Sequence, residues 1–254
     1  MEAKMIANQA KRKMLAGQPA LGAVAVLGTP LAPECYSLAG YDFVIVDNQH
    51  GEWTMETSAA AFRAIAHGSA TPMARAAKND FFQIGGLLDR GALGIVVPMV
   101  NSAAEAAAAA FATRYVPRGG RSVGPFGAEY LKAKDYVREA DEEIFLAVQI
   151  ETPQAVDQAE AIMATPGVDG CWIGPMDLAL CLGVAPGSPN HEAAIMRVLD
   201  ACRKTGKIPG IYGGADPAHW LERGFLFVTV TMDTSALQAS AQATLTDLNR
   251  FRRG

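Results

Sequence analysis

Short apolar runs rich in β-branched residues recur along the chain, and segments with the pattern of amphipathic helices separate them. Each run has the length of a buried strand, and each intervening segment is long enough to cross back over a sheet. The predicted strands, eight in number, span residues 21–28, 43–48, 71–76, 94–100, 144–151, 168–175, 207–213 and 225–232. The pattern therefore predicts parallel strands joined by helical crossovers.

Residues typical of helix ends mark several of the intervening segments. Asp80 is an N-cap candidate ahead of the segment FFQIGGLLDR. Ser102 and Glu105 have the spacing of a capping box ahead of an alanine-rich segment. Thr152 and Pro153 place a capping hydroxyl and an N1 proline directly after the fifth predicted strand.

Eight strand–helix units in 254 residues fit the size of a (β/α)8 TIM barrel. A doubly wound open sheet would alternate strands and helices in the same way. The count favours the barrel, so we expect an α/β fold with one barrel domain over residues 1–254. The segment 1–18 interleaves charged and apolar residues, which predicts an amphipathic helix ahead of the barrel and not a secretory signal.

The composition excludes several classes of protein. Apolar runs end after about eight residues, whereas a membrane-spanning helix needs roughly 20, so we expect no membrane partner. The chain has 22 Lys and Arg against 26 Asp and Glu, for a net charge of −4, and it has no basic stripe, which argues against a nucleic-acid partner. Four widely spaced cysteines without a CxxC pair predict reduced thiols in a cytoplasmic protein.

Nucleotide-binding loops have no support in the sequence. No GxGxxG follows a predicted strand, and no GxxxxGK[ST] occurs. The segment PRGGRSVG (117–124) is rich in glycine and arginine, but it follows a predicted helix instead of leading into one. We interpret it as a mobile connection.

Polar residues gather where the predicted strands end. In a (β/α)8 barrel these carboxyl ends meet at one face, and the chemistry of such proteins is found there. The second strand ends in Asp47-Asn48-Gln49-His50, the third in Arg75, the fifth in Gln149-Ile150-Glu151 and the sixth in Gly174-Pro175-Met176-Asp177. Because such groups are costly to bury without partners, four strands ending this way predict one shared polar site.

Glu151 and Asp177 are the candidate metal ligands. Two carboxylates from neighbouring strands can hold Mg²⁺, Mn²⁺ or Co²⁺ through oxygen and leave positions for water and substrate. Zinc has less support, because the chain has no HExxH motif and no cysteine cluster. The alternative is that each carboxylate caps the following helix or pairs with an arginine.

Arg75 and His50 are the candidate catalytic side chains at the same face. The Arg75 guanidinium should point into the mouth of the barrel, where it could hold a carboxylate or an enolate oxygen. An ion pair with Glu151 or Asp177 is the structural alternative. His50 alone among four histidines ends a strand, and an imidazole suits acid–base chemistry near neutral pH. His67, His191 and His219 fall in helical or loop segments and are predicted to lie at the surface.

The placement of the lysines argues against an imine mechanism. A Schiff-base enzyme needs a desolvated lysine at a strand end. Lys78 lies three residues beyond Arg75, and Lys207 lies at the wrong end of the seventh strand. The sequence therefore favours metal chemistry.

Several ordered motifs resemble one known family. The segments FVIVDNQHGEWT, PMARAAKND, LLDRGALGIVVPMVNSAAEA, RYVPRGGRSVG, VQIETPQAV and GVDGCWIGPMDLALCLG are similar to the metal-dependent class II pyruvate aldolases of the HpcH/HpaI type. The resemblance runs from about residue 20 to residue 235. It implies a (β/α)8 barrel and reversible cleavage of a 4-hydroxy-2-oxo acid to pyruvate, or hydroxypyruvate, and an aldehyde, in the catabolism of aromatic compounds or sugar acids.

The resemblance also assigns roles to individual residues. It implies a divalent cation held by Glu151 and Asp177, with Arg75 beside the keto oxygen of a pyruvate-like ligand. It further implies His50 with Asp89 as a catalytic dyad. The ligand carboxylate would meet the backbone around Gly174, Pro175 and Met176, with Gln149 beside it. Members of the family form hexamers through an exchanged C-terminal helix, for which residues 235–251 are the candidate.

Two departures from the family pattern bear on the choice of the aldehyde acceptor. Many members read Gly-Glu-His where this chain reads Asn48-Gln49-His50, and the segment after Gly124 also differs. The family's acceptor is therefore not carried over to this chain.

Two other functions stay open. A lyase acting on a CoA thioester of the malyl- or citramalyl-CoA type would need a basic phosphate-binding patch, for which only Arg118 and Arg121 are candidates. A barrel that binds a 2-oxo acid without turning it over would have the same ligand-binding residues.

Overall fold

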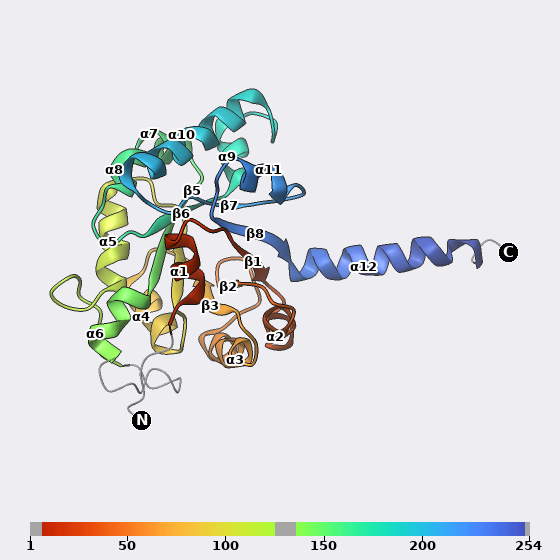
Figure 1. The fold of residues 1–254 in the computed structure, drawn as a ribbon, viewed down its shortest axis with the longest axis horizontal. Coiled ribbons are helices and arrows are strands. Elements are labelled where there is room, and N and C mark those ends of the chain that lie inside the picture. The colour runs from red at the N-terminus through yellow and green to blue at the C-terminus, as the bar shows by residue number, and fades with distance from the viewer. Residues whose placement is uncertain (1–6, 125–135, 252–254) are drawn as a thin grey trace.

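The strands of the computed structural model, which describes residues 7–124 and 136–251, form a closed parallel barrel (Figure 1). The strands follow one another around the barrel in chain order, and β8 pairs with β1. They are β1 (Ala20–Ala25), β2 (Phe43–Asp47), β3 (Thr71–Arg75), β4 (Gly94–Val97), β5 (Phe145–Ile150), β6 (Gly170–Ile173), β7 (Gly210–Tyr212) and β8 (Phe227–Met232). All eight predicted strands form, and the barrel is confirmed over the open sheet.

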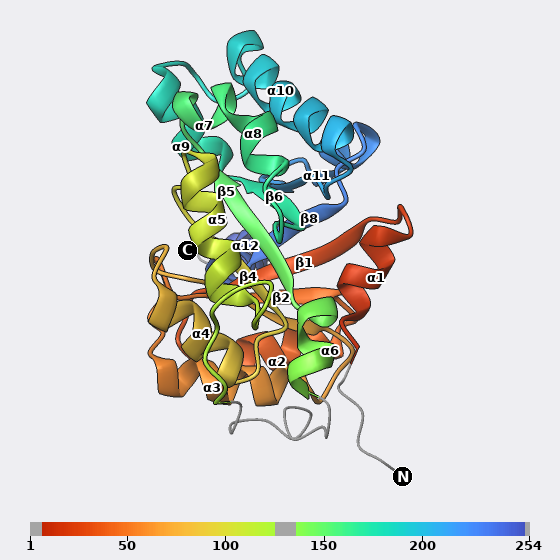
Figure 2. The ribbon, with the colours of Figure 1, turned by 90° about the vertical axis from the view of Figure 1, so that its left-hand side faces the viewer.

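Helices form the outer layer around the strands (Figures 1 and 2). They are α2 (Leu31–Leu38), α3 (Met55–Ile65), α4 (Phe81–Asp89), α5 (Ala103–Thr113), α6 (Tyr136–Glu143), α7 (Pro153–Asp157), α8 (Ala159–Met163), α9 (Pro175–Leu182), α10 (Pro189–Thr205) and α11 (Pro217–Glu222). In this alternating arrangement a helix begins near the carboxyl end of one strand and ends near the amino end of the next.

The predicted helix caps are present, with one difference. The side chains of Asp80 and Thr152 each accept a hydrogen bond from the backbone N–H three positions along, at 2.8 and 3.1 Å. The Ser102 hydroxyl likewise accepts from the Glu105 N–H at 3.2 Å. The Glu105 carboxylate, however, accepts from the N–H of Asn101 at 2.6 Å instead of completing a capping box with Ser102.

Aromatic packing and an N-terminal helix close the end of the barrel that is formed by the amino ends of the strands. Phe43, Phe145 and Phe227 are buried near the amino ends of their strands, and the Phe227 ring lies 4.5 Å from Phe43 and 5.0 Å from Phe145 between centroids. Helix α1 (Gln9–Leu15) packs Ala10 and Met14 into the same apolar cluster. Because this end is filled, the carboxyl end of the barrel is the one left open for a ligand.

The segment 117–124 is more firmly held than a mobile connection. The Arg121 side chain is only 1% exposed, and its Nη2 donates to Asp89 at 2.8 Å and to the Tyr136 hydroxyl at 3.1 Å. The Arg118 guanidinium pairs with Glu142 at 2.6 Å. The segment following Gly124 lies outside the described residues as far as residue 135.

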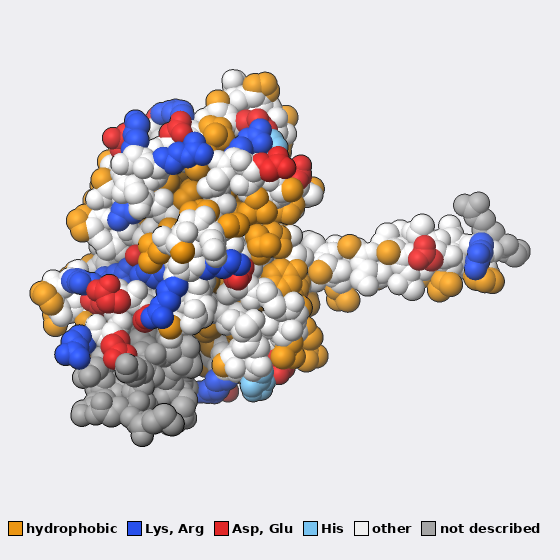
Figure 3. Space-filling view, viewed as in Figure 1, with side chains coloured by type: hydrophobic (Ala, Val, Ile, Leu, Met, Phe, Trp, Pro, Cys, Tyr) orange, Lys and Arg blue, Asp and Glu red, His pale blue; other side chains and the backbone are white. Residues whose placement is uncertain are grey.

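Helix α12 (Asp233–Leu248) leaves the barrel after β8 and projects away from it (Figure 1). The first residue of the helix, Asp233, is still held against the barrel. Its carboxylate accepts the backbone N–H groups of Val26 and Leu27, which follow β1, at 3.0 and 3.1 Å. Apolar side chains are exposed along α12 and the short 3₁₀ helix η2 (Asn249–Phe251) that follows it (Figure 3). They are Leu237, Leu245, Leu248 and Phe251.

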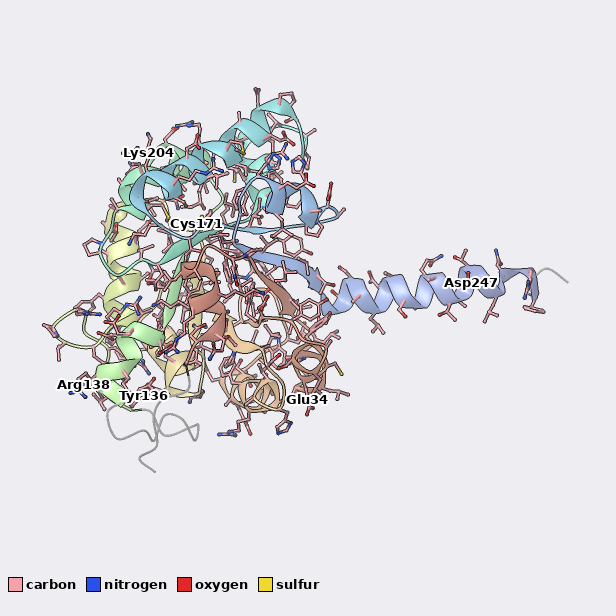
Figure 4. The ribbon with its side chains drawn as sticks, viewed as in Figure 1. Glu34, Tyr136, Arg138, Cys171, Lys204 and Asp247 are labelled. Atoms are coloured by element: carbon pink, nitrogen blue, oxygen red, sulfur yellow. The ribbon has the colours of Figure 1, made fainter. Side chains whose placement is uncertain are left out.

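The four cysteines are unpaired thiols, as predicted. The Cys171 sulfur lies on β6 (Figure 4), 3.5 Å from the sulfur of Cys202 on α10. Among the helices of the described ranges, none has the length and apolar character needed to cross a membrane.

Candidate active site

A cavity of about 280 Å³ opens at the carboxyl ends of the strands. Its lining includes seven of the candidate site residues that the sequence singled out: His50, Arg75, Gln149, Gly174, Pro175, Met176 and Asp177. Asp47 lines it as well, and Glu151, only 3% exposed, lies next to Gly174. Apolar side chains from β1, β6, β7 and β8 form the rest of the wall, namely Val24, Val26, Trp172, Tyr212 and Met232. The predicted shared site is therefore present as one cavity.

Arg75 pairs with Asp47 and not with either candidate metal ligand. The two residues occupy the same register position at the ends of β2 and β3. Arg75 Nε donates to Asp47 Oδ1 at 2.7 Å, and Arg75 Nη2 donates to Asp47 Oδ2, which makes a bidentate pair. The guanidinium lies over the Trp172 ring, 5.2 Å from its centroid. The alternative of an ion pair with Glu151 or Asp177 is wrong, because Asp47 already occupies one edge of the guanidinium.

Asp47 also shapes the turn that carries His50. Its Oδ1 accepts the backbone N–H of Gln49 at 3.0 Å and that of His50 at 3.4 Å. One carboxylate therefore sets the position of both candidate catalytic groups. Asp47 is 1% exposed, so its charge depends on the Arg75 pair for compensation.

Glu151 is a buried carboxylate held by neutral donors. Its Oε1 accepts the N–H of Met99 at 2.9 Å, and its Oε2 accepts from Gln149 Nε2 at 2.5 Å. Burial raises the pKa of Glu151, and the negative charge of Asp177 raises it further, while the Met99 N–H and Arg75 oppose the shift. Binding of a proton or a cation by this carboxylate is therefore favoured.

Gly174 leaves the space above this carboxylate open. A Cβ at this position would lie 2.7 Å from Glu151 Oε2 and 2.9 Å from Gln149 Nε2, so a side chain would clash with both. Gly174 is also the N-cap of α9 and offers no side chain to the first-turn N–H groups. The start of α9 is thus free to meet an anion.

Buried His191 corrects one sequence prediction. It is only 3% exposed, whereas His67 is exposed and His219 is half-buried. His191 Nδ1 accepts the N–H of Gly187 at 3.0 Å, which leaves Nε2 to donate to the Pro175 carbonyl at 2.8 Å. The histidine faces inward because it belongs to the buried stripe of α10, and it fixes the first turn of the helix that carries Asp177.

His50 and Asp89 are not brought together within one chain. His50 is exposed at the rim of the cavity, and within the described ranges its ring has no hydrogen-bond partner. Asp89 ends α4, close to the amino end of β4, and its carboxylate pairs with Arg121. The two residues therefore lie at opposite ends of the barrel.

The residues present fit a divalent cation. Two carboxylates with a space kept open by Gly174 supply the oxygen ligands that Mg²⁺ and Mn²⁺ prefer. Each Glu151 oxygen accepts one hydrogen bond and retains a further lone pair. In the part of the chain that the structure describes, no group of three or more His, Cys, Asp or Glu could hold a metal. Such a site would therefore leave most coordination positions to water and ligand.

Sequence reasoning placed Asp47 among the polar strand ends but missed its pairing with Arg75, although Asp47 ends the strand next to the one that Arg75 ends. It also missed two further contributors to the site. Trp172 under the guanidinium and the Met99 N–H on Glu151 depend on how strands β6 and β4 lie beside their neighbours. Neither contact follows from local sequence.

Comparisons with known proteins point to one family. Residues 28–239 match the family model described as HpcH/HpaI aldolase/citrate lyase. A 4-hydroxy-2-oxo-heptane-1,7-dioate aldolase of Salmonella paratyphi C is 36% identical over 93% of this chain and 92% of its own length. An aldolase of the same name from Escherichia coli is also 36% identical, over 93% of each chain.

A solved structure gives the same result. A HpcH/HpaI aldolase/citrate lyase family protein from Burkholderia cenocepacia superposes with a TM-score of 0.89 and 31% identity. The match covers 95% of this chain and 99% of that one.

Proposed function

The chain belongs to the HpcH/HpaI aldolase/citrate lyase family, and we propose that it is a metal-dependent aldolase acting on 4-hydroxy-2-oxo acids. Its relatives make it a carbon–carbon lyase. The proposed products are an aldehyde and pyruvate or hydroxypyruvate. The observation that carries the proposal is the buried Glu151 carboxylate beside Asp177, at the same cavity as the Arg75 guanidinium.

Glu151 and Asp177 would hold the divalent ion, with Mg²⁺, Mn²⁺ and Co²⁺ as the candidates. When bound, the ion would supply Lewis-acid stabilisation of the charge that develops on the keto oxygen. The family membership and the proximity of the Glu151 and Asp177 carboxylates support this assignment.

Arg75 would stabilise the same developing charge. Asp47 and Trp172 hold one edge and one face of its guanidinium, which fixes the orientation of the remaining N–H groups. A charge held in place before the reaction costs no reorganisation as the enolate forms.

The carboxylate of the 2-oxo acid would sit at the start of α9. Gly174 leaves the first-turn N–H groups uncapped, and the positive end of the helix dipole favours an anion there. Gln149 lies beside this position, with its Oε1 buried and unpartnered. The backbone around Pro175 and Met176 lines the same cavity.

His50 would move the proton. In the cleavage direction it would accept the proton of the 4-hydroxyl as the C3–C4 bond breaks, and the bonding electrons would remain on the pyruvate enolate. The same imidazolium would then return the proton to C3. Its exposed position at the cavity rim allows transfer either directly or through one water.

The dyad implied by the family resemblance would need two copies of the chain. Since Asp89 and His50 lie at opposite ends of one barrel, Asp89 could orient His50 only in a neighbouring subunit. The projecting helix α12, with its exposed apolar side chains, supports an exchange of C-terminal helices in a homo-oligomer, the hexamer of the family being the expectation.

Mixing two inactive variants tests the shared dyad. We expect His50→Ala and Asp89→Asn to lose most activity separately and to recover about a quarter of the wild-type activity when co-expressed, because random pairing completes that share of shared sites. The measurement is the aldol cleavage rate of the purified mixture. A mixture no more active than the sum of its parts would assign Asp89 a structural role with Arg121 only.

The two alternative functions have less support. Arg118 and Arg121, the candidate phosphate ligands for CoA, pair with Glu142 and Asp89 at the other end of the barrel from the cavity. A non-catalytic binder would have no need of a base at the rim.

Cleavage assays with and without metal test the proposed function. We expect 4-hydroxy-2-oxo acids of different chain lengths to release pyruvate, EDTA to abolish the release, and Mn²⁺, Mg²⁺ or Co²⁺ to restore it. Borohydride with pyruvate should leave the protein mass unchanged, because no lysine lines the cavity among residues 7–124 and 136–251. Binding of pyruvate without any turnover would favour the non-catalytic barrel, and a trapped adduct would overturn the metal mechanism.

A further inference from the structure

Two successive N–H groups in the loop after β4 are turned toward the candidate metal ligand and its strand. The Met99 N–H donates to Glu151 Oε1 at 2.9 Å, and the N–H of the next residue, Val100, donates to the Gln149 carbonyl at 3.3 Å. In an extended strand, successive N–H groups point to opposite edges. The backbone therefore has to leave the extended conformation at Met99.

Met99 makes this turn in the left-handed region of backbone conformation. Its φ is 56°, and among the described residues other than glycine it is alone there. This conformation is unfavourable for a residue with a Cβ and persists only where the surrounding contacts hold it. The Met99 side chain is 51% exposed, so its packing contributes little. The backbone of Met99 and its hydrogen-bond partners therefore have to hold the conformation.

The Asn101 side chain is the partner that holds Met99 from the other side. Its Nδ2 donates to the Met99 carbonyl at 2.9 Å, and its Oδ1 accepts the Thr152 hydroxyl. The amide has one consistent orientation, because a carbonyl can only accept a hydrogen bond. Both neighbours of this amide are fixed. The Asn101 N–H donates to Glu105 at 2.6 Å, and the Thr152 oxygen accepts the Ala155 N–H at 3.1 Å.

These contacts form a closed network, which we call the Glu151 network and which consists of Met99, Asn101, Glu151 and Thr152. It runs from Glu151 to its chain neighbour Thr152, from there to the Asn101 amide, on to the Met99 carbonyl, and back to Glu151 through the Met99 N–H. It joins the loops that follow β4 and β5. A change at Asn101 therefore reaches Glu151 Oε1 through a single residue.

We propose that Asn101 is a positioning residue for the metal ligand, because its side chain keeps Met99 in the left-handed conformation and thereby keeps the Met99 N–H on Glu151. The inference rests on the proposed function, in which Glu151 and Asp177 would hold a divalent cation. Asn101 does not line the active-site cavity, so it acts through Met99 alone. A carboxylate oxygen fixed in advance loses less freedom when a cation binds.

Mn²⁺ binding by calorimetry tests the role of Asn101. We expect Asn101→Ala to raise the Kd for Mn²⁺ by about tenfold to a hundredfold, because Glu151 loses the N–H that fixes its Oε1. Asn79→Ala is the matched control, since the Asn79 side chain also donates to a backbone carbonyl, that of Glu105 at 2.9 Å, but lies outside the Glu151 network. It should leave the Kd unchanged. An Asn101→Ala protein with the wild-type Kd would overturn the proposal.

Glycine at position 99 tests how Asn101 acts. Glycine adopts the left-handed conformation without a steric penalty, so it depends less on a side chain that holds it there. We expect Met99→Gly to keep the wild-type Kd for Mn²⁺, and the addition of Asn101→Ala to this variant to raise the Kd by about threefold or less. A general structural role of Asn101 in the loop would not be rescued by glycine. A loss as large as in the wild-type background would therefore contradict the proposal.

Hydrogen exchange of the Met99 N–H gives a readout that needs no metal. In EDTA, we expect Asn101→Ala to speed the exchange of this amide by about tenfold or more, because the N–H no longer stays on Glu151. Peptides that cover β5 should keep their exchange rates, which excludes general unfolding. The measurement is mass spectrometry of peptides that contain Met99. An unchanged rate at Met99 would show that Asn101 does not hold it.

Mn²⁺ binding by the wild type separates this inference from the proposed function. A wild type that neither binds Mn²⁺ nor cleaves 4-hydroxy-2-oxo acids would refute the metal-dependent aldolase, and the role of Asn101 with it. A wild type that does both, with Asn101→Ala equal to it in the Kd for Mn²⁺ and in the exchange rate of Met99, would refute only the role of Asn101.

Discussion

Replacing Glu151 by glutamine is expected to lower kcat for aldol cleavage by about 10³-fold or more, because stabilisation of the keto oxygen by a bound cation is worth several kcal/mol. The substitution keeps the size of the side chain and removes one of two charged ligands. The Met99 N–H can still be accepted by the new amide oxygen, and Gln149 can turn its amide so that its unpartnered Oε1 accepts the new N–H. The fold should therefore persist.

The metal-free protein should become more stable with the same substitution. Burial raises the pKa of Glu151 in the folded protein, so the wild type loses folding free energy as the pH rises from the ordinary value of 4.5 through the raised folded pKa, and the loss is complete above the folded pKa. We expect the Tm of Glu151→Gln in EDTA to exceed that of the wild type by a few degrees at neutral pH. The difference should shrink as the pH falls toward 4.5, the ordinary value for glutamate, where the wild-type group is also neutral.

Three measurements check the expectation: the cleavage rate, Mn²⁺ binding by calorimetry and the Tm in EDTA across pH. Glu160→Gln is the matched control, since Glu160 is exposed and pairs with Lys204 on the outer helices. It should change none of the three. A Glu151→Gln protein that still binds Mn²⁺ tightly and cleaves substrate at the wild-type rate would remove Glu151 from the metal site.

The barrel was predictable because each strand is buried on both faces. β2, β4, β5 and β6 are buried at every position, and apart from Asp47 and Gln149 near the strand ends their residues are apolar or glycine, so each appears in the sequence as a mostly apolar run. The polar residues at the strand ends were predictable as a group for the same reason. A polar residue directly after a buried run has to lie at the mouth of the barrel.

Pairings between elements were harder to predict. Asp89 lies at the end of a helix, and a helix in this fold returns the chain to the opposite end of the barrel. The position of Asp89 near Arg121 therefore follows from topology, and a resemblance carried over residue by residue cannot show it. His191 was misplaced at the surface, although it falls on the same helical stripe as buried Ile195, Val198 and Cys202.

Replacing Asp47 by asparagine is expected to destabilise the protein by about 3–5 kcal/mol, because it leaves the Arg75 charge buried without its partner. The side chains of Arg75 and Asp47 are 10% and 1% exposed, so water cannot replace the lost carboxylate. An asparagine can still accept from the backbone of Gln49 and His50 through its oxygen, but its amide nitrogen would face the guanidinium as a second donor. In a chain of 254 residues this loss corresponds to a fall in Tm of roughly 10 °C.

Asp47→Asn should also lower activity, and this effect can be measured separately from the loss of stability. The freed guanidinium can leave the face of Trp172, and we expect kcat to drop by about 10²-fold at a temperature where the variant is folded. The double variant Asp47→Asn with Arg75→Met removes both charges. It should regain much of the lost stability and none of the activity.

An exposed ion pair provides the control for this prediction. The Arg197 guanidinium pairs with Asp157 at 2.8 Å, but unlike the Arg75–Asp47 pair these side chains are 59% and 68% exposed. Asp157→Asn should cost at most about 1 kcal/mol and leave kcat unchanged. If Asp47→Asn proved equally mild, the Arg75 guanidinium would have to be solvated through the open mouth of the cavity. Its orientation by Asp47 would then contribute little to the site.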